Sequence, residues 1–296
     1  MEIRIDGENV ILNLPGFSLS DTLNCGQCFR FEYNINNTIF GVVGNRKILL
    51  EQKGNDVIFY NTTKDDFHNF WYDYFDLSTD YEKIKKVISA DSVMKQAIKF
   101  AGGIRVLKQP QWETLCSFII SQNNNIPRIK GIIQRLCENF GELLSENKKP
   151  HVLSKNFGKL LSENEKPHIY GFPSYKRIAK CSLQDLSVLK AGFRAKYIFD
   201  AAQKVNSGEI SFEKVENMNI EDARKYLMKI KGVGVKVAEC TLLFGFAKKE
   251  AFPIDVWIKR ALDNYYKNGF PDFLKSNAGI AQQILFHYIR NNASEL

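Results

Sequence analysis

The pattern of apolar residues changes once along the chain, near Thr79, and this change restricts the possible folds more than any other feature. Before it, short alternating runs are separated by tight polar turns, which is typical of an antiparallel meander. After it, apolar residues recur every three or four positions, as in amphipathic helices. We therefore predict an α+β protein with an antiparallel β-sheet domain at residues 1–78 and a mostly α-helical region at residues 79–296.

The individual elements follow from the same patterns. Four strands are predicted at residues 28–33, 39–43, 47–51 and 57–61. Asn125, followed by Pro127, is typical of a helix cap with proline in the first turn. Helices are predicted at residues 81–89, 93–99, 112–122, 126–140, 183–189, 195–205, 220–230, 235–246, 256–266 and 278–290.

One segment of thirteen residues occurs twice. NFGELLSENKKPH at residues 139–151 recurs as NFGKLLSENEKPH at residues 156–168, with eleven matching positions at a spacing of 17. Two copies are too few for a solenoid, which needs at least three repeats. We interpret residues 139–168 as a duplicated surface segment without a catalytic role.

Charge and cysteine usage narrow the function classes. The formal net charge of +8 suits a polyanionic partner such as nucleic acid. Neither a long apolar run nor a basic leader is present, so no membrane span or export signal is expected. The six cysteines are widely spaced, and most of them are expected to be free thiols. Cys25 and Cys28 lack the further ligands of a zinc site, and the four histidines lack ligand spacing, so no metal is predicted.

Residues 230–238, IKGVGVKVA, end one predicted helix and begin the next through two glycines. Gly232 and Gly234 permit a left-handed turn and leave backbone N–H groups uncovered at the start of a helix. Such a helix start favours an anion, and a DNA phosphate fits it without any base being read. The pattern indicates a helix-hairpin-helix motif, and the alternative is an ordinary corner between two helices.

Two charged residues near this hairpin point to chemistry. Lys236 lies in the first turn of the second helix, where the positive helix end favours the neutral amine, which is the nucleophilic form. Asp255 precedes the predicted helix 256–266 and could be only an N-cap. Cleavage of an N-glycosidic bond builds positive charge on the sugar, which a nearby carboxylate would stabilise. Together with the hairpin, this pair indicates a DNA glycosylase.

The hairpin, lysine and aspartate resemble the helix-hairpin-helix DNA glycosylase superfamily, and further motifs resemble its 8-oxoguanine DNA glycosylase/lyase family. These motifs are NCGQCFR at residues 24–30, SQNNNIPRI at 121–129, GFPS at 171–174 and AGFRAKY at 191–197. The match runs from about residue 10 to residue 290, apart from the repeat. The resemblance implies a sheet domain plus two mostly helical lobes that carry the hairpin, with the DNA cleft between the lobes.

The resemblance also implies roles for residues at matching positions. Lys236 would attack the sugar C1′ and form a Schiff base, and Asp255 would be the essential carboxylate. The residues around the flipped base would be Gly26 through its carbonyl, Cys240 and Phe286 on the two faces, and Gln282 at the Watson–Crick edge.

The resemblance implies a second set of residues for the rest of the DNA. They would be Asn123, Arg128 and Arg194 at the estranged cytosine, Phe193 as a wedge in the base stack, and Gly232 and Gly234 in the hairpin. Two positions depart from the family. Phe193 stands where tyrosine is common, which a wedge tolerates, whereas Trp257 replaces a histidine that contacts phosphate, so that contact is not carried over. The four-cysteine iron–sulfur motif of the endonuclease-III-like branch is absent, which argues against that branch.

Several of these residues also have plainer interpretations. Phe286 could be a core residue and Gln282 an exposed one. Cys240 could be a small buried apolar residue. Arg128 and Arg194 could be surface charges.

The predicted function is excision of 8-oxoguanine opposite cytosine from duplex DNA in base excision repair, by base flipping, a lysine Schiff base and β-elimination. Two alternatives remain open. One is an alkyl-base glycosylase, which uses the aspartate without a lysine, and the other is a non-enzymatic helix-hairpin-helix DNA-binding protein. We expect damaged double-stranded DNA as the partner, no cofactor, no membrane and a monomer. The expected location is cytoplasmic, associated with the nucleoid in a prokaryote, or nuclear in a eukaryote.

Overall fold

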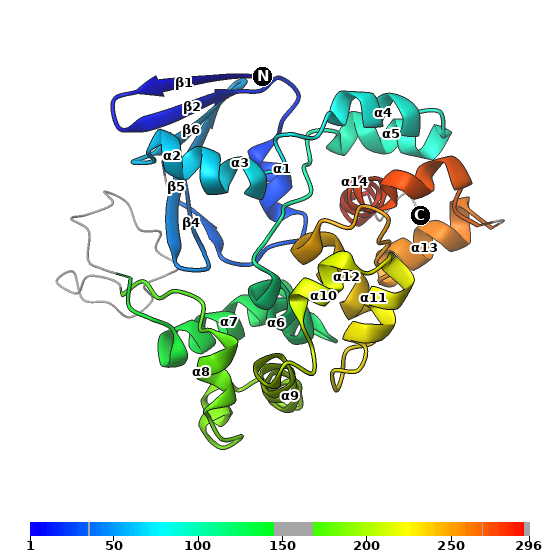
Figure 1. The fold of residues 1–296 in the computed structure, drawn as a ribbon. Helices are drawn as coiled ribbons and strands as arrows, with labels where there is room; N and C mark the ends of the chain where they lie inside the picture. Colours follow the sequence, from blue (N-terminus) through cyan, green and yellow to red (C-terminus); the bar gives the residue numbers. More distant parts are fainter. Residues whose placement is uncertain (35, 145–167, 268, 293–296) are drawn as a thin grey trace.

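The computed structural model describes residues 1–34, 36–144, 168–267 and 269–292. Its N-terminal part is a six-stranded antiparallel sheet with the strand order β1-β2-β6-β5-β4-β3, and helices form the rest (Figure 1). This arrangement confirms the predicted α+β class. The strands are β1 (Glu2–Asp6), β2 (Asn9–Asn13), β3 (Phe31–Tyr33), β4 (Ile39–Val43), β5 (Arg46–Lys53) and β6 (Asp56–Tyr60).

The sheet contains the predicted meander and two further strands. The bounds of β4 match the prediction, and those of β5 and β6 differ from it by one or two residues. The prediction of a strand from residue 28 is wrong, because β3 begins only at Phe31. The preceding segment is held as a loop by Gln27, whose side chain donates to the Arg105 carbonyl and accepts from the Leu107 N–H, at 2.8 and 2.9 Å. Strands β1 and β2 were not predicted.

Helices also occur within the first 78 residues, where only strands were predicted. They are α1 (Leu19–Asn24), α2 (Lys64–Asp66), the π-helical turn η1 (Phe67–Trp71) and α3 (Tyr72–Tyr74). The last three lie against the sheet (Figure 1). Phe59 of β6 makes edge-to-face contacts with Phe67 and Phe75, at ring-centroid distances of 4.9 and 5.6 Å. This aromatic packing forms the core of the sheet domain.

Most predicted helices of the second region are present. The predicted bounds of α12 match, and Asn125 caps α7 by accepting from the Arg128 N–H at 3.0 Å. The predicted helix 183–189 is only the 3₁₀ turn η2, and α8 and α10 were not predicted. The helices are α4 (Tyr81–Ile88), α5 (Ser92–Ala101), α6 (Gln111–Ser121), α7 (Ile126–Phe140), α8 (Tyr175–Ala179), η2 (Asp185–Leu189), α9 (Arg194–Ser207), α10 (Phe212–Asn217), α11 (Ile220–Leu227), α12 (Val235–Phe246), α13 (Val256–Tyr265), η3 (Asp272–Asn277) and α14 (Ala278–Asn291).

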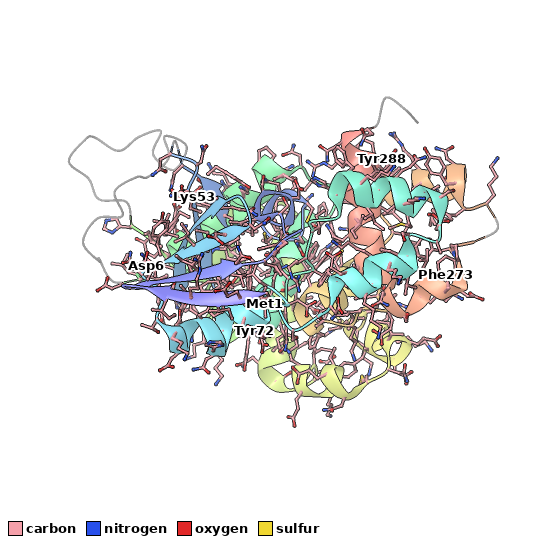
Figure 2. All side chains as sticks on the ribbon, turned by 90° about the horizontal axis from the view of Figure 1, so that it is seen from above. Met1, Asp6, Lys53, Tyr72, Phe273 and Tyr288 are labelled. Carbon is pink, nitrogen blue, oxygen red and sulfur yellow. The ribbon has the colours of Figure 1, made fainter. Side chains whose placement is uncertain are left out.

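Most of the helices fall into two groups, and the first of them joins early and late parts of the chain. Helices α4 and α5 pack with η3 and α14, and α13 packs on α14 (Figure 1). Helices α6 to α9 pack together, and α12 joins them by lying against α6. In the view from above, Asp6 and Lys53 of the sheet lie on the opposite side of the molecule from Phe273 and Tyr288 (Figure 2).

The sheet domain is fastened to both ends of the helical region. The buried Arg105 side chain donates to the Phe75 carbonyl at 2.9 Å. Gln283 of α14 donates to the Cys25 carbonyl at 2.8 Å, and the Cys25 side chain belongs to the apolar core of the helical region. The boundary at residues 78 and 79 therefore stays a prediction, because contacts on both sides of it cross between the two parts.

Three other predictions concern the chain as a whole. All six cysteines are free thiols, whereas the sequence predicted this for most of them. Within the described ranges, none of the helices is both long and apolar enough to cross a bilayer. Residues 145–167 of the duplicated segment lie outside the described residues, so its assignment as a surface insertion stays a prediction.

Candidate active site and DNA interface

In the hairpin between α11 and α12, Gly232 adopts the predicted left-handed conformation, whereas Gly234 is extended, with a φ of −93°. Gly232 has a φ of +79°, and a Cβ at this position would lie 2.2 Å from Cδ2 of Tyr197. Gly234 occupies the N-cap position of α12 but has no side chain to cap it, and a Cβ there would meet nothing within 4 Å. The first N–H groups of α12 are therefore open to an approaching anion.

Lys236 lies in the first turn of α12 against an apolar wall. Its Nζ is 5.2 Å from the ring centroid of Phe118, which itself stacks on Phe244. The Cys240 thiol lies one turn later, close enough for the Lys236 charge to influence its pKa. Burial raises the pKa of Cys240, and the nearby Lys236 offsets only part of this shift, so the thiol stays neutral. The lysine is thus held by its neighbours rather than extended into solvent.

Asp255 is an N-cap, as its sequence position predicts, but capping uses only one of its oxygens. Oδ1 accepts from the N–H groups of Trp257 and Ile258, at 3.0 and 2.9 Å. Oδ2 accepts no hydrogen bond from the residues that the structure describes. The carboxylate therefore has a fixed orientation and one oxygen left for a cationic partner.

Glu239 is a site residue that the sequence analysis did not identify. It is 3% exposed and lies one turn after Lys236. Its Oε1 forms an ion pair with Arg224 of α11, and its Oε2 accepts from the Phe252 N–H at 2.6 Å. One carboxylate thus connects both helices of the hairpin to the loop that leads to Asp255. The available signal was the single acidic residue of a helix in which, apart from Lys236 and Thr241, the other residues are apolar.

The residues predicted to surround a flipped base come from two distant segments. Gly26 has a φ of +80°, and a Cβ at this position would lie 3.6 Å from Cε1 of Phe286. Phe286 is partly buried at the edge of the core, and Cys240 is buried. The structure therefore brings Gly26 and Phe286 together, while Cys240 lies beside Lys236.

Gln282 is buried, so the interpretation of it as an exposed helical residue is wrong. It is 4% exposed, and its Nε2 donates to the Pro253 carbonyl at 3.0 Å. Its Oε1 is buried and has no hydrogen-bond donor among the described residues. Because a buried acceptor without a partner is unfavourable, this atom marks a place where a ligand would supply a donor.

The residues predicted to contact the estranged cytosine or the base stack differ in exposure and in their hydrogen-bond partners. Asn123 is exposed and has a φ of +45°, a left-handed conformation that asparagine tolerates. Arg128 is exposed, and its guanidinium has no acceptor among the described residues. Phe193 is 47% exposed and carries the Arg194 guanidinium over its ring at 4.5 Å, so an apolar ring is available as a wedge.

Arg194 is not a surface charge, so that plainer interpretation is wrong. It is 3% exposed and donates to the carbonyls of Gln122 and Asn123 at 2.9 Å and of Ala191 at 3.2 Å. Burial lowers the pKa of Arg194, and the positive charge of nearby Arg128 lowers it further. Most Arg194 donors are therefore committed to backbone, which indicates that this side chain holds the turn that presents Asn123.

Comparison with known proteins identifies the family of the chain. The family model for the 8-oxoguanine DNA glycosylase N-terminal domain matches residues 9–115. The family model for HhH-GPD superfamily base excision DNA repair proteins matches residues 116–269. The chain belongs to the HhH-GPD superfamily.

Within the described ranges, no group of three or more histidine, cysteine or acidic residues could hold a metal ion.

The chain is similar to solved structures over nearly its whole length and to a curated relative over about half of it. MBOgg1 in complex with a low-affinity DNA ligand is 38% identical, with a TM-score of 0.87 and 99% of each chain covered. The 8-oxoguanine glycosylase/lyase of Clostridium acetobutylicum, in complex with DNA containing cytosine opposite 8-oxoguanine, is 34% identical, with a TM-score of 0.87 and 99% of each chain covered. The N-glycosylase/DNA lyase of Saccharomyces cerevisiae is 32% identical over 56% of this chain, which spans only 42% of the yeast protein.

Proposed function

We propose that this protein is a bifunctional glycosylase/lyase that excises 8-oxoguanine opposite cytosine from duplex DNA. The observation that carries the proposal is the environment of Lys236, at the uncapped start of α12 and in contact with Cys240 and Phe118. A lysine nucleophile separates this activity from that of an alkyl-base glycosylase, which needs only the aspartate. The similar glycosylase/lyases support the same reaction. We further propose that the enzyme acts as a monomer, at the nucleoid of a prokaryote or in the nucleus of a eukaryote.

Each residue of the site has a different role in the proposed reaction. The hairpin holds a phosphate, and Phe193 fills the stack as the lesion flips out, at a cost of a few kcal/mol. The Lys236 amine forms a bond to C1′ as the C1′–N9 bond breaks and its electron pair leaves with the base. The free oxygen of Asp255 stabilises the positive charge on the sugar. Ring opening then gives an imine, and loss of a C2′ proton expels the 3′ phosphate.

The base pocket distinguishes 8-oxoguanine from guanine at N7. The Gly26 carbonyl would accept the N7–H of 8-oxoguanine, whereas guanine offers a lone pair there and leaves a buried acceptor unpaired, at a cost of about 1–3 kcal/mol. Glycine leaves room for the base beside Phe286. Since the φ of Gly26 is +80°, alanine would strain the backbone, and the oxidised and normal bases themselves are the sharper test of this contact.

Gln282 supplies the first prediction. Its unpartnered Oε1 would accept an N–H from the Watson–Crick edge of the flipped purine. Gln282→Leu should therefore slow 8-oxoguanine release about ten- to a hundredfold. Stability should change by less than about 1 kcal/mol, because the lost bond to the Pro253 carbonyl is offset by removal of the unpaired acceptor. Single-turnover base release and thermal melting measure the two effects, and unchanged release would remove Gln282 from the base pocket.

Arg128 supplies the second prediction. Cytosine presents two adjacent acceptors, and adenine presents only one beside a donor, so an arginine distinguishes the two. Arg128 is the arginine with free donors, whereas Arg194 holds the Asn123 turn. Arg128→Ala should reduce the preference for 8-oxoguanine opposite cytosine over adenine by about 1–3 kcal/mol. Excision rates on the two duplexes measure this preference. If both rates fall equally, Arg128 binds phosphate and reads no base.

A single assay tests the proposed function as a whole. The protein is incubated with a duplex that holds one 8-oxoguanine opposite cytosine, with and without borohydride. We expect release of the free base, a nicked strand and, with borohydride, a covalent protein–DNA complex. Base release without trapping would indicate an alkyl-type mechanism, and binding without release would indicate a non-enzymatic DNA-binding protein.

A further inference from the structure

Arg290, in the last turn of α14, lies beside the proposed base pocket. A Cβ built at Gly26 would be 3.9 Å from Nη1 of Arg290, and the guanidinium carbon is 6.0 Å from the ring centroid of Phe286. Arg290 follows Phe286 by four residues, so both side chains lie on one face of the helix. The pocket wall formed by Gly26 and Phe286 therefore has a cation at its border.

Apart from its position over the Phe286 ring, the charge of Arg290 has no structural use that the described residues show. Its guanidinium forms no hydrogen bond or ion pair with any of them. Asp21 of the neighbouring α1 lies 3.7 Å from the His287 imidazole and does not pair with Arg290. Arg290 is partly buried but still reached by solvent, so its donors are available to a ligand that enters the pocket.

We propose that Arg290 determines lesion specificity by donating a hydrogen bond to the C8 oxygen of the flipped purine. The inference rests on the proposed function. The C8 oxygen is attached next to N7, so a base that donates its N7–H to the Gly26 carbonyl presents this oxygen on the same edge. Arginine can only donate, and the C8–H of guanine offers it no acceptor. The oxidised base would then be recognised at two neighbouring atoms, by the Gly26 carbonyl and by Arg290.

The test separates reading of the base from binding of the DNA. Arg290→Met, Arg290→Lys and wild type are compared on two duplexes, one with 8-oxoguanine opposite cytosine and one with a preformed abasic site opposite cytosine. Lys95→Met, which removes an exposed charge from α5, is the matched control. We expect Arg290→Met to slow base release about ten- to a hundredfold, since a hydrogen bond from a charged donor is lost.

Nicking at the abasic site should stay unchanged in both variants, because that substrate has no base to read, and this also shows that the variants fold. Arg290→Lys should recover part of the base release, and Lys95→Met should match wild type on both substrates. Equal losses on both duplexes would show that Arg290 binds phosphate. Undiminished base release by Arg290→Met would show that Arg290 has no role in reading the base. Either result overturns this inference and leaves the proposed function intact. A wild-type protein that releases no 8-oxoguanine overturns the proposed function as well.

Discussion

Lys236→Gln is expected to abolish both base release and borohydride cross-linking while duplex binding is retained. An amide nitrogen cannot attack C1′ or form an imine, so the loss should be at least about 10³-fold. Glutamine is one heavy atom shorter than lysine and remains polar, so the local packing should be kept. Single-turnover excision, trapping and a binding titration measure the three properties separately.

The matched control for this variant is Lys225→Gln, which removes an exposed lysine from α11. It should keep excision and cross-linking, because Lys225 is outside the hairpin turn and the pocket. Cross-linking that persists in Lys236→Gln would assign the Schiff base to another amine. Loss of duplex binding in that variant would instead place Lys236 among the phosphate contacts.

Asp255→Asn should separate the helix-capping role of this residue from its proposed role in stabilising the positive sugar. Asparagine caps helices as well as aspartate, so the melting temperature should stay within about 3 °C of wild type. The charge is lost, and the positive sugar then has no anion beside it, so excision should fall about 10²- to 10³-fold. Melting curves and single-turnover rates on the 8-oxoguanine duplex give both numbers.

Asp80→Asn is the matched control, because Asp80 caps α4 in the same way, by accepting from the Lys83 N–H at 3.0 Å. It should leave both melting and excision unchanged. If Asp255→Asn excised at the wild-type rate, Asp255 would be a cap and nothing more. A large drop in its melting temperature would mean that the charge itself stabilises the fold.

Local signals explain why the hairpin was predictable. Gly232, Gly234 and the start of α12 are determined within a few residues, so their spacing alone predicted the turn and placed Lys236 in the first turn. The cap at Asp255 is equally local. What these residues do in catalysis came from the resemblance and stays a proposal.

Long-range contacts explain what the sequence could not show. Arg194 donates to the carbonyls of Gln122 and Asn123, which lie 72 and 71 positions earlier in the chain. The burial of Arg194 therefore has no local signature in the sequence. The unpaired Oε1 of Gln282 is likewise a result of packing between distant segments. In the sheet domain, η1 and α3 were not predicted, because their aromatic residues follow neither a strand nor a helix period and are ordered by contact with Phe59.

The hydrogen bond from Gln283 to the Cys25 carbonyl has a consequence for how lesion choice could change in evolution. It joins the segment before Gly26 to the helix that carries Phe286, so one wall of the pocket comes from each end of the chain. The hairpin and Lys236 belong to neither end. A shortened descendant without the sheet domain would keep the hairpin and Lys236 but would lose the Gly26 carbonyl, so the residues of α14 alone would have to distinguish the oxidised base.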